Sequence, residues 1–395
     1  MPGSVPLKLV KSNVLSLLKP VPFTRLHPRM AHLLGESEGV VIPKQEVIDF
    51  IVRCMTRSGC STPHAVALAD TLAEGDYRGH FSHGLNRLEM YVRDIETGIT
   101  VSNAQPEVVK ETPAVALIDG NNCLGPVVGN YCMEKAIEKA KTVGVGVVTA
   151  RNSNHYGIAG WYGLSALRQG LIGLSGTNTS PLVVPSRSRE PALGTNPLAF
   201  FAPGKDGDSF ELDMATSAVA LGKVEMAARK ETDIPQGWGV DDKGDATTDP
   251  HRVVDGGGLC PLGGAEMTGG YKGYGLAMMV ETLCGVLAGA SFGTDIRGWK
   301  TTSTKANLGQ FFIAIDPGAF GDRAGFEDRM SALNGQMRTR QKAAGETGEI
   351  LVAGDPEKAH VLKCEQEGGI RYHPNLVASM NELAVRLGVE PMKPK

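Results

Sequence analysis

The sequence lacks the features that mark several large classes of protein. It has no excess of charge of one sign, since 40 lysines and arginines stand against 43 aspartates and glutamates. A nucleic-acid-binding protein usually carries a strongly basic face, so we expect no nucleic-acid partner. The nearest candidate for a membrane span, residues 276–292, has Glu281 in its middle and is more typical of a buried helix. We therefore expect no membrane partner, and small molecules or copies of the chain as partners.

The sequence also lacks a cysteine pattern. Its seven cysteines are odd in number and scattered, and no two have the CxxC spacing of a zinc or redox site. This usage favours a reducing compartment and free thiols. His80 and His83 lie close together but have no clear third ligand, so we predict no metal site.

Three common nucleotide and hydrolase motifs are missing. Residues 144–149 match only two glycines of GxGxxG, and they lie inside a predicted strand instead of a strand-to-helix turn. Lys272 sits in a glycine-rich segment, but Gly273 follows where a P-loop needs Ser or Thr. No serine has the GxSxG context of a nucleophile elbow. A Rossmann dehydrogenase, a P-loop NTPase and an α/β-hydrolase are all disfavoured.

The first residues differ in composition from the rest. They are basic, contain several serines and an apolar stripe, and have no acidic residue before Glu36. That composition is typical of a mitochondrial transit peptide, and a disordered leader with Met30 as an alternative start is the second interpretation. We predict a leader over residues 1–44 and a mitochondrial or cytoplasmic location.

The remaining chain predicts two structural regions. Apolar residues at helical spacing predict helices over residues 45–55 and 85–96. Thr62-Pro63 is typical of an N-cap followed by a proline at the first helical position, which predicts a helix over 62–77. From residue 106, valine-rich strands alternate with helices. After residue 318 the chain is charged and helical again. We predict an α/β domain over 106–317 and a mainly α-helical domain formed by 45–105 with 318–395.

A first polar motif carries His83 and Arg87. If Ser82 caps the helix predicted over residues 85–96, His83 and Arg87 lie on one helix face near its positive end. A guanidinium fork beside a histidine donor suits a carboxylate. The alternative is a solvated helix start with incidental charges.

A second motif places His155 on a polar loop directly after a valine-rich strand. A histidine at a strand end is well placed for proton transfer, because small effects move its pKa across neutrality. The alternative is a loop histidine bonded to backbone.

A third set of segments combines Gly, Thr, Asn and Pro at the ends of regular elements. These are Gly176–Pro181, Gly194–Pro197, Asp213–Ser217 and Tyr271–Gly275. Backbone donors and short polar side chains hold a phosphate or ribose in proteins without a P-loop. Any one of the segments is equally explained as an ordinary turn or cap.

Together these segments resemble the malate/L-lactate dehydrogenase family, a non-Rossmann group that includes ureidoglycolate, sulfolactate and diketogulonate enzymes. The likeness runs from about residue 45 to 390. The most specific strings, in order, are Ser82-His83-Gly84 with Arg87, Asn154–Gly157, Gly194–Phe200, Leu212–Ser217 and Lys272–Gly275.

The resemblance implies an α/β (α+β) fold with a mixed-sheet, non-Rossmann NAD(P)-binding domain, a smaller α-helical domain and a homodimer. It implies that His155 is the proton acceptor and that His83 and Arg87 line the substrate pocket. It also implies a set of residues that hold the dinucleotide: Thr179, Asp213, Met214, Ala215, Lys272, Gly354, Asp355 and Pro356.

Two positions depart from the family pattern. Ser180 stands where some members have an aspartate, so no aspartate partner for the catalytic histidine is expected there. The segment Ser186–Arg189 is more basic than the glycine-rich stretch common at that place, and its arginines either touch a cofactor phosphate or are solvated.

The sequence thus predicts an NAD-dependent oxidoreductase, with NADP as the alternative cofactor. Arg87 would hold the carboxylate of a 2-hydroxy acid while His155 takes its hydroxyl proton and hydride passes to the nicotinamide. Malate is the first choice of substrate, and lactate or another 2-hydroxy acid is the alternative. Two other classes remain open, a metal-dependent hydrolase using His80, His83 and His155, and a non-catalytic cofactor-binding protein.

Overall fold

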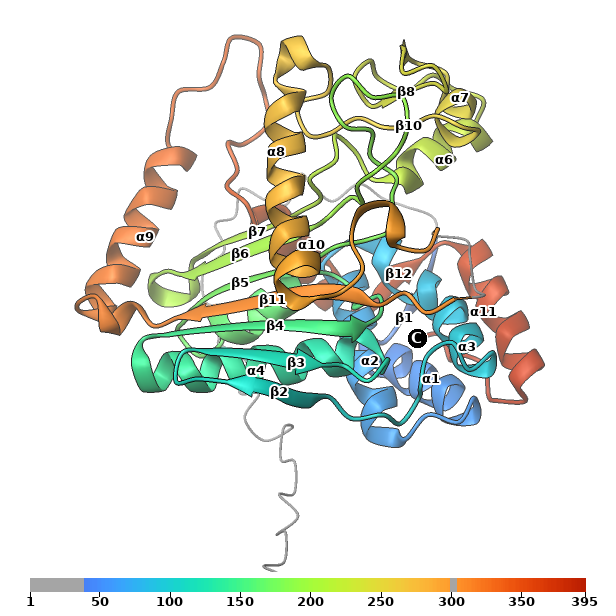
Figure 1. Ribbon diagram of the computed structural model, residues 1–395, viewed down its shortest axis with the longest axis horizontal. Helices are drawn as coiled ribbons and strands as arrows, with labels where there is room; N and C mark the ends of the chain where they lie inside the picture. Colours follow the sequence, from blue (N-terminus) through green and yellow to red (C-terminus); the bar gives the residue numbers. More distant parts are fainter. Residues whose placement is uncertain (1–38, 299–303) are drawn as a thin grey trace, which may run out of the picture.

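The computed structural model describes residues 39–298 and 304–395 (Figure 1). Across these ranges, seven strands form the main sheet in the order β2-β3-β4-β11-β5-β6-β7. Within this described sheet β3 and β4 are parallel, and the other neighbouring pairs are antiparallel. The strands are β2 (Glu107–Glu111), β3 (Val115–Asp119), β4 (Val145–Ser153), β5 (Ile172–Thr177), β6 (Leu198–Pro203), β7 (Ser209–Met214) and β11 (Leu308–Ile315). The mixed α/β fold predicted from the sequence is confirmed.

Helices cover both faces of this sheet. Phe311 and Phe312 are adjacent buried residues of β11, so their side chains point to opposite faces. Phe312 packs in the largest core cluster, which includes α4 and α5. Phe311 packs instead against Val280 and Cys284 of α8 and the π-helical turn η7. These elements are α4 (Gly125–Val143), α5 (Gly160–Leu167), α8 (Gly270–Glu281) and η7 (Thr282–Val286).

A helical region beside the sheet combines both ends of the described chain (Figure 1). Its elements are β1 (Val40–Ile42), α1 (Lys44–Arg57), α2 (Thr62–Tyr77), α3 (Leu88–Glu96), β12 (Ile370–Tyr372) and α11 (Pro374–Leu387). The first two helices lie close to their predicted positions. The N-cap of α2 is Ser61, and the apolar faces of α1, α2, α3 and α11 join one core cluster.

The predicted leader, residues 1–44, falls largely outside the described residues. Its last part does not behave as a leader, because β1 pairs with β12 in antiparallel fashion. Ile42 is completely buried, and α1 already begins at Lys44. The folded region therefore begins before residue 45. A three-residue strand is too short to produce a periodic sequence signal.

A smaller region lies above the sheet in Figure 1 and has a core of its own. The segment 241–271 contains β9, α7, β10 and η6, which the sequence pattern did not predict. Its strands and helices are too short to be recognised by periodicity. The region's elements are α6 (Leu221–Arg229), β8 (Gly239–Val240), β9 (Ala246–Thr247), α7 (Pro250–Val254), β10 (Gly258–Leu259) and η6 (Glu266–Thr268).

Two helices complete the architecture, α9 (Arg323–Arg338) at the left of Figure 1 and α10 (Asp355–Glu367). Short helical turns link the larger elements: η3 (Phe81–His83), η4 (Leu85–Arg87), η5 (Lys205–Gly207), η8 (Gly293–Asp295) and η9 (Pro317–Ala319). In the part of the chain that the structure describes, no helix is both long and apolar enough to cross a bilayer.

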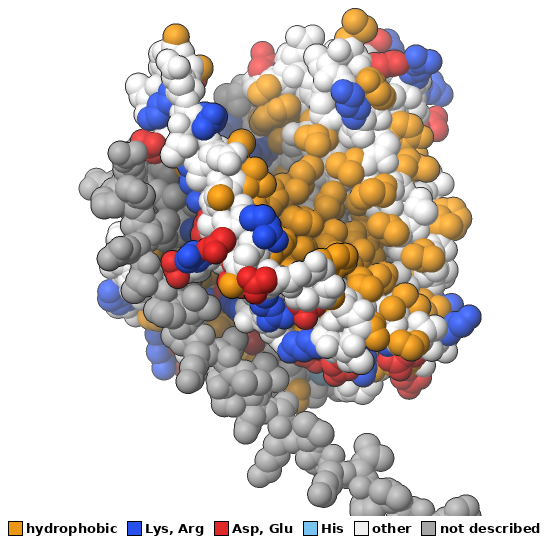
Figure 2. All heavy atoms as spheres, turned by 90° about the vertical axis from the view of Figure 1, so that its left-hand side faces the viewer, with side chains coloured by type: hydrophobic (Ala, Val, Ile, Leu, Met, Phe, Trp, Pro, Cys, Tyr) orange, Lys and Arg blue, Asp and Glu red, His pale blue; other side chains and the backbone are white. Residues whose placement is uncertain are grey.

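One face of the molecule is rich in hydrophobic side chains (Figure 2). It is the side that lies to the left in Figure 1. Exposed hydrophobic side chains are frequent on α8, on η7 with the residue after it, and on α9. They include Met278, Met279, Val286, Leu287, Leu333 and Met337. A contiguous apolar patch on a protein surface commonly marks an interaction site.

Candidate active site

A cavity of about 240 Å³ lies at the edge of the main sheet where β4 and β5 end and β6 begins. Part of its lining, the histidine wall, consists of His80, Ser82, His83, Arg87 and His155. Another part, the strand-end wall, consists of Thr179, Ser180, Thr195, Asp213, Met214 and Ala215. A third part comes from α6 and the residue before it, namely Ala220, Leu221, Gly222 and Glu225.

His155 is held by contacts on both sides of its loop. The preceding residue, Asn154, is buried, and its Nδ2 donates to the backbone oxygen of Cys123 at 2.8 Å. The hydroxyl oxygen of Tyr91 on α3 lies 2.5 Å from Nδ1 of His155 and 3.3 Å from the backbone oxygen of the same residue. Tyr91 is buried, so the helical region fixes one ring nitrogen of a histidine carried by the sheet.

The expectation that Ser82 caps the helix carrying His83 and Arg87 is wrong. These residues lie on two short turns, η3 and η4, and α3 begins only at Leu88. Ser82 Oγ lies 2.8 Å from Nδ1 of His83 and makes no cap. The two side chains nevertheless line the same cavity.

A buried carboxylate explains why the helix does not start earlier. Asp76, at the end of α2, accepts a hydrogen bond from the backbone nitrogen of Leu85 at 2.8 Å. A Cβ at Gly84 would lie 1.8 Å from Oδ1 of Asp76, so the chain passes this carboxylate at a distance only glycine allows. Burial raises the pKa of Asp76 to about 7. Asp76 therefore fixes the backbone of the turn that carries His83 and Arg87.

The two predicted histidines lie together. The rings of His83 and His155 are stacked, with centroids 5.7 Å apart and planes 17° from parallel. Arg87 Nε donates to the backbone oxygen of Ser82 at 2.7 Å, which fixes its guanidinium near the histidine pair. The structure thus brings the three predicted catalytic residues to one wall.

The electrostatics of this wall favour neutral histidines. Burial lowers the pKa of His155 well below its usual value, and the neighbouring His83 and Arg87 lower it further. Burial, followed by the charge of Arg87, lowers the pKa of His83 to about 4. Both rings are neutral at pH 7, so His155 is able to accept a proton.

The strand-end wall presents hydroxyls and one carboxylate. The Oγ1 atoms of Thr179 and Thr195 are 3.4 Å apart. Gly194 permits this approach, because a Cβ there would lie 2.1 Å from Oγ1 of Thr179. Asp213 Oδ2 accepts from the backbone nitrogen of Gly160 at 2.7 Å, and burial raises the pKa of Asp213. Side chains from the segment after β5, the segment before β6 and the end of β7 therefore meet in one small space.

Four predicted cofactor residues do not line this cavity. Lys272 is exposed on α8, with Nζ 5.8 Å from the ring centroid of Tyr271. The other three, Gly354, Asp355 and Pro356, lie at the N-terminus of α10. Gly354 packs against β7, since a Cβ there would lie 2.7 Å from Cβ of Glu211.

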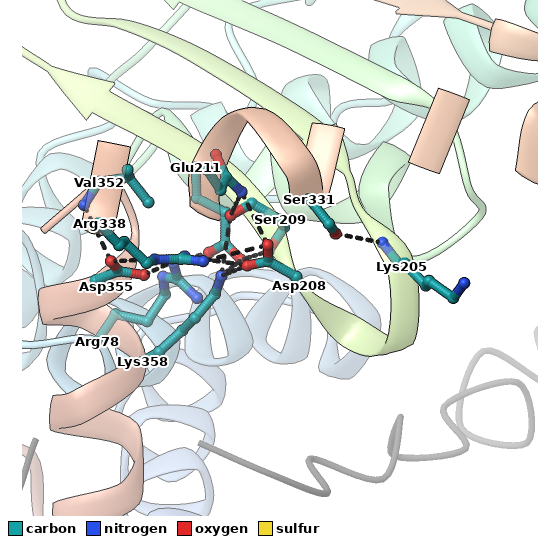
Figure 3. Close-up of polar contacts among 11 residues, drawn as sticks. Arg78, Lys205, Asp208, Ser209, Glu211, Ser331, Arg338, Val352, Asp355 and Lys358 are labelled. Atoms are coloured by element: carbon teal, nitrogen blue, oxygen red, sulfur yellow. Dashed lines mark hydrogen bonds and ion pairs between the residues drawn. The ribbon is translucent and has the colours of Figure 1, made fainter. Parts of the chain in front are cut away.

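A buried network of charges joins α10 to β7 (Figure 3). Arg78 pairs with Glu211, and Lys358 lies 3.5 Å from the same carboxylate. Arg338 donates to Asp355 at 2.7 and 2.9 Å. Because Glu211 lies two residues before Asp213, this network fixes the strand that supplies part of the strand-end wall.

The arginines of the segment 186–189 are both exposed and lie near carboxylates. Arg187 donates to Glu266 at 2.6 Å, and Arg189 lies 3.6 Å from Glu190. Neither lines the cavity.

Sequence reasoning missed Tyr91 and Glu225. Tyr91 stands four residues after Arg87, and this spacing could have indicated that both face the site. The same position is equally typical of a residue buried in the hydrophobic core. Glu225 lies on α6, whose sequence has no motif, and it reaches the cavity only through the fold. Burial lowers the pKa of Arg87, and the carboxylate of Glu225 partly offsets this.

The histidines do not form part of a metal-ligand cluster in the described ranges. Among residues 39–298 and 304–395, no three His, Cys, Asp or Glu side chains converge as a cation site would require.

Comparison with known proteins shows the family to which the chain belongs. Residues 42–381 match the family model described as malate/L-lactate dehydrogenase. The chain is 43% identical to the malate dehydrogenase of Pyrococcus horikoshii over 352 residues, which cover 88% of this chain and 96% of that protein. It is 38% identical to the malate/(S)-sulfolactate dehydrogenase of Methanothermus fervidus over 351 residues, 89% of this chain and 99% of that protein.

Solved structures show the same likeness. The structure of the Pyrococcus horikoshii malate dehydrogenase superimposes with a TM-score of 0.83 at 39% identity, covering 91% of this chain and 99% of that one. The malate dehydrogenase of Entamoeba histolytica gives a TM-score of 0.84 at 33% identity and covers 89% and 99%. The chain belongs to the malate/L-lactate dehydrogenase family of oxidoreductases.

Proposed function

We propose that this protein interconverts malate and oxaloacetate with a nicotinamide cofactor, NAD by preference. The observation that carries the proposal is the pairing of the two walls in one small cavity. One wall holds Arg87 and a neutral histidine, and the other holds the hydroxyls of Thr179 and Thr195. Arg87 suits the carboxylate of the acid, the neutral histidine suits its hydroxyl proton, and the threonine hydroxyls suit the carboxamide of a nicotinamide ring.

The residues of the strand-end wall fit a nicotinamide. A carboxamide needs a hydrogen-bond donor and an acceptor, and threonine hydroxyls provide both. Thr179 and Thr195 present such hydroxyls side by side. Met214 and Ala215 add apolar surface that suits the face of the ring. We assign Thr179, Asp213, Met214 and Ala215 to the cofactor, with Lys272 and Gly354–Pro356 toward its more distant parts.

The binding of the acid depends on Arg87. Its guanidinium makes two parallel hydrogen bonds to the carboxylate beside the reacting carbon. The stacked His83 provides a donor on the same wall. This clamp fixes the hydroxyl-bearing carbon between the two walls and presents its hydroxyl to His155.

The proton is handled by His155. Tyr91 engages Nδ1, which fixes the ring, and Nε2 takes the hydroxyl proton during oxidation. When bound, the nicotinamide supplies the hydride acceptor. In the reduction, protonated His155 returns the proton to the carbonyl oxygen. A bound carboxylate compensates the charge of Arg87, so binding raises the pKa of His155 toward the range that proton transfer requires.

A panel of 2-keto acids tests this function. Oxaloacetate, pyruvate, sulfopyruvate and other small 2-keto acids are each assayed with NADH and with NADPH. We expect oxaloacetate with NADH to give the highest kcat/KM. A preference for pyruvate would replace malate by lactate, and binding of NADH without turnover of any acid would favour a non-catalytic cofactor-binding protein.

We also propose that the protein is a homodimer with a non-Rossmann cofactor domain. The apolar face in Figure 2 supports the dimer, because a second copy would cover side chains such as Met278 and Met279. Sedimentation at micromolar concentration should give about twice 41.8 kDa. An active monomer would contradict this proposal.

A further inference from the structure

Glu281 is a buried carboxylate at the end of α8 with no basic partner in the described part of the chain. It is 4% exposed, and no Lys, Arg or His among the described residues lies within ion-pair distance of it. Its oxygens accept hydrogen bonds from N–H groups instead. A buried carboxylate is stabilised only when such donors surround it, so its position is tightly specified.

Two of these donors are asparagine amides. Nδ2 of Asn178 donates to Oε1 of Glu281 at 2.9 Å, and Nδ2 of Asn196 donates to Oε2 at 2.7 Å. The backbone nitrogen of Gly293 donates to Oε1 at 3.1 Å. Both asparagines are completely buried, one after β5 and one before β6. A single carboxylate therefore joins the two segments that supply Thr179 and Thr195.

The carboxylate and the backbone oxygen of Ala277 together set which way Asn196 faces, because both accept hydrogen bonds from its Nδ2, at 2.7 and 3.2 Å. Because its Nδ2 points to Glu281, its Oδ1 points to the backbone nitrogen of Thr179 and accepts a hydrogen bond at 3.2 Å. Asn196 adopts a left-handed conformation, with φ of +36°, which fits a position fixed by its side chain. Reversing the amide would set an NH₂ group against the N–H of Thr179.

The packing around Asn178 is equally close. A Cβ at Gly285 would lie 3.1 Å from Nδ2 of Asn178 and 2.7 Å from Cβ of Phe292. Gly285 belongs to η7, the π-helical turn that starts directly after Glu281. Such turns inside helices frequently occur at functional sites.

We propose that Glu281 is a positioning residue for cofactor binding, which acts through Asn178 and Asn196 to set Thr179 and Thr195. It touches neither the cavity nor the reacting atoms. This inference rests on the proposed function, because it assumes that the strand-end wall holds the nicotinamide. According to this proposal, cofactor binding requires a buried carboxylate outside the cavity, on the far side of the strand-end wall.

Glu281→Gln tests the proposal because it keeps the shape of the side chain. The backbone N–H of Gly293 cannot reverse, so the new amide oxygen stays beside it and the new NH₂ group faces Nδ2 of Asn196. Asn196 then loses this bond or reverses and loses its bond to Thr179. We expect the Kd for NADH, measured by fluorescence titration, to rise about tenfold, which corresponds to about 1.4 kcal/mol. The KM for oxaloacetate should change less than twofold.

The paired variant E281Q/N196D separates positioning from a merely structural role. One oxygen of the carboxylate introduced at position 196 would accept from the amide introduced at position 281, and the other would accept from the N–H of Thr179. We expect this double variant to recover part of the NADH affinity that E281Q loses, because the bonds to positions 281 and 179 return while the bond to the backbone oxygen of Ala277 does not. N196D alone would place two buried carboxylates together and should be worse than the double variant. The matched control is Glu138→Gln, an exposed residue of α4, which should change nothing.

The outcomes are distinguishable. A wild-type protein that binds no NADH would defeat the proposed function itself. If the wild type binds NADH and the E281Q variant binds it with equal affinity, the positioning role alone is overturned. So would a double variant as defective as E281Q, whether the defect appears in NADH affinity or in the yield of folded protein.

Discussion

Replacing Tyr91 by Phe removes one hydroxyl and leaves the packing of α3 intact. That hydroxyl lies 2.5 Å from Nδ1 of His155, in a buried setting. Without it, Nδ1 keeps only the long contact from the backbone nitrogen of Gly157 at 3.4 Å. Leaving a buried ring nitrogen poorly paired in this way costs roughly 1–3 kcal/mol. Since 1.36 kcal/mol is a factor of ten in rate, kcat should fall about 10- to 100-fold if the loss falls on the transition state.

The assay compares steady-state reduction of oxaloacetate with NADH titration. NADH affinity should stay within about twofold of wild type, because Tyr91 does not line the cavity. Tyr131→Phe, a change at a half-buried residue of α4, serves as the matched control. A Tyr91→Phe enzyme with wild-type kcat would refute the idea that α3 orients the catalytic histidine.

Three further predictions concern charge and the N-terminal segment. Arg87→Lys keeps the charge but loses the guanidinium fork, so the KM for the keto acid should rise at least tenfold while the Kd for NADH is unchanged. An unchanged KM would show that Arg87 does not bind the carboxylate. Because the pKa of His155 is lowered, kcat/KM for oxidation should be constant from neutral pH upward and should fall only in acid. The kcat/KM for reduction should rise as pH falls. A pH profile for oxidation with an inflection above pH 7 would contradict a lowered pKa. A chain that starts at Met30 keeps β1 and should fold and turn over normally, and loss of folded enzyme would show that the leader contributes to the fold.

The sequence predicted the sheet and the main helices because their apolar patterns are long. β4 (Val145–Ser153) begins with a valine-rich segment, and α1 shows a clear helical period. The start of α2 was indicated by Thr62-Pro63. Position at a strand end was enough to predict His155 as a candidate base. Short elements such as β1 and η3 left no such signal, because two or three residues complete no period.

The parts of the site that could not be predicted depend on tertiary contacts. Tyr91 and His155 are 64 residues apart, and nothing in either segment indicates their hydrogen bond. Glu281 was recognised only as a reason to predict a buried helix, and its asparagine partners lie 85 and 103 residues away. Ser82 was misread as a helix cap because the buried Asp76 beneath Gly84 cannot be inferred from local sequence.

In the proposed reaction, His155 moves the proton and does not bind the cofactor. The direct test is His155→Ala, with kcat for oxaloacetate reduction and the Kd for NADH measured on the same preparation. We expect kcat to fall roughly 10²- to 10⁴-fold while the Kd is nearly unchanged. A variant that keeps wild-type kcat, while His83→Ala abolishes turnover, would assign the proton transfer to η3 and contradict it.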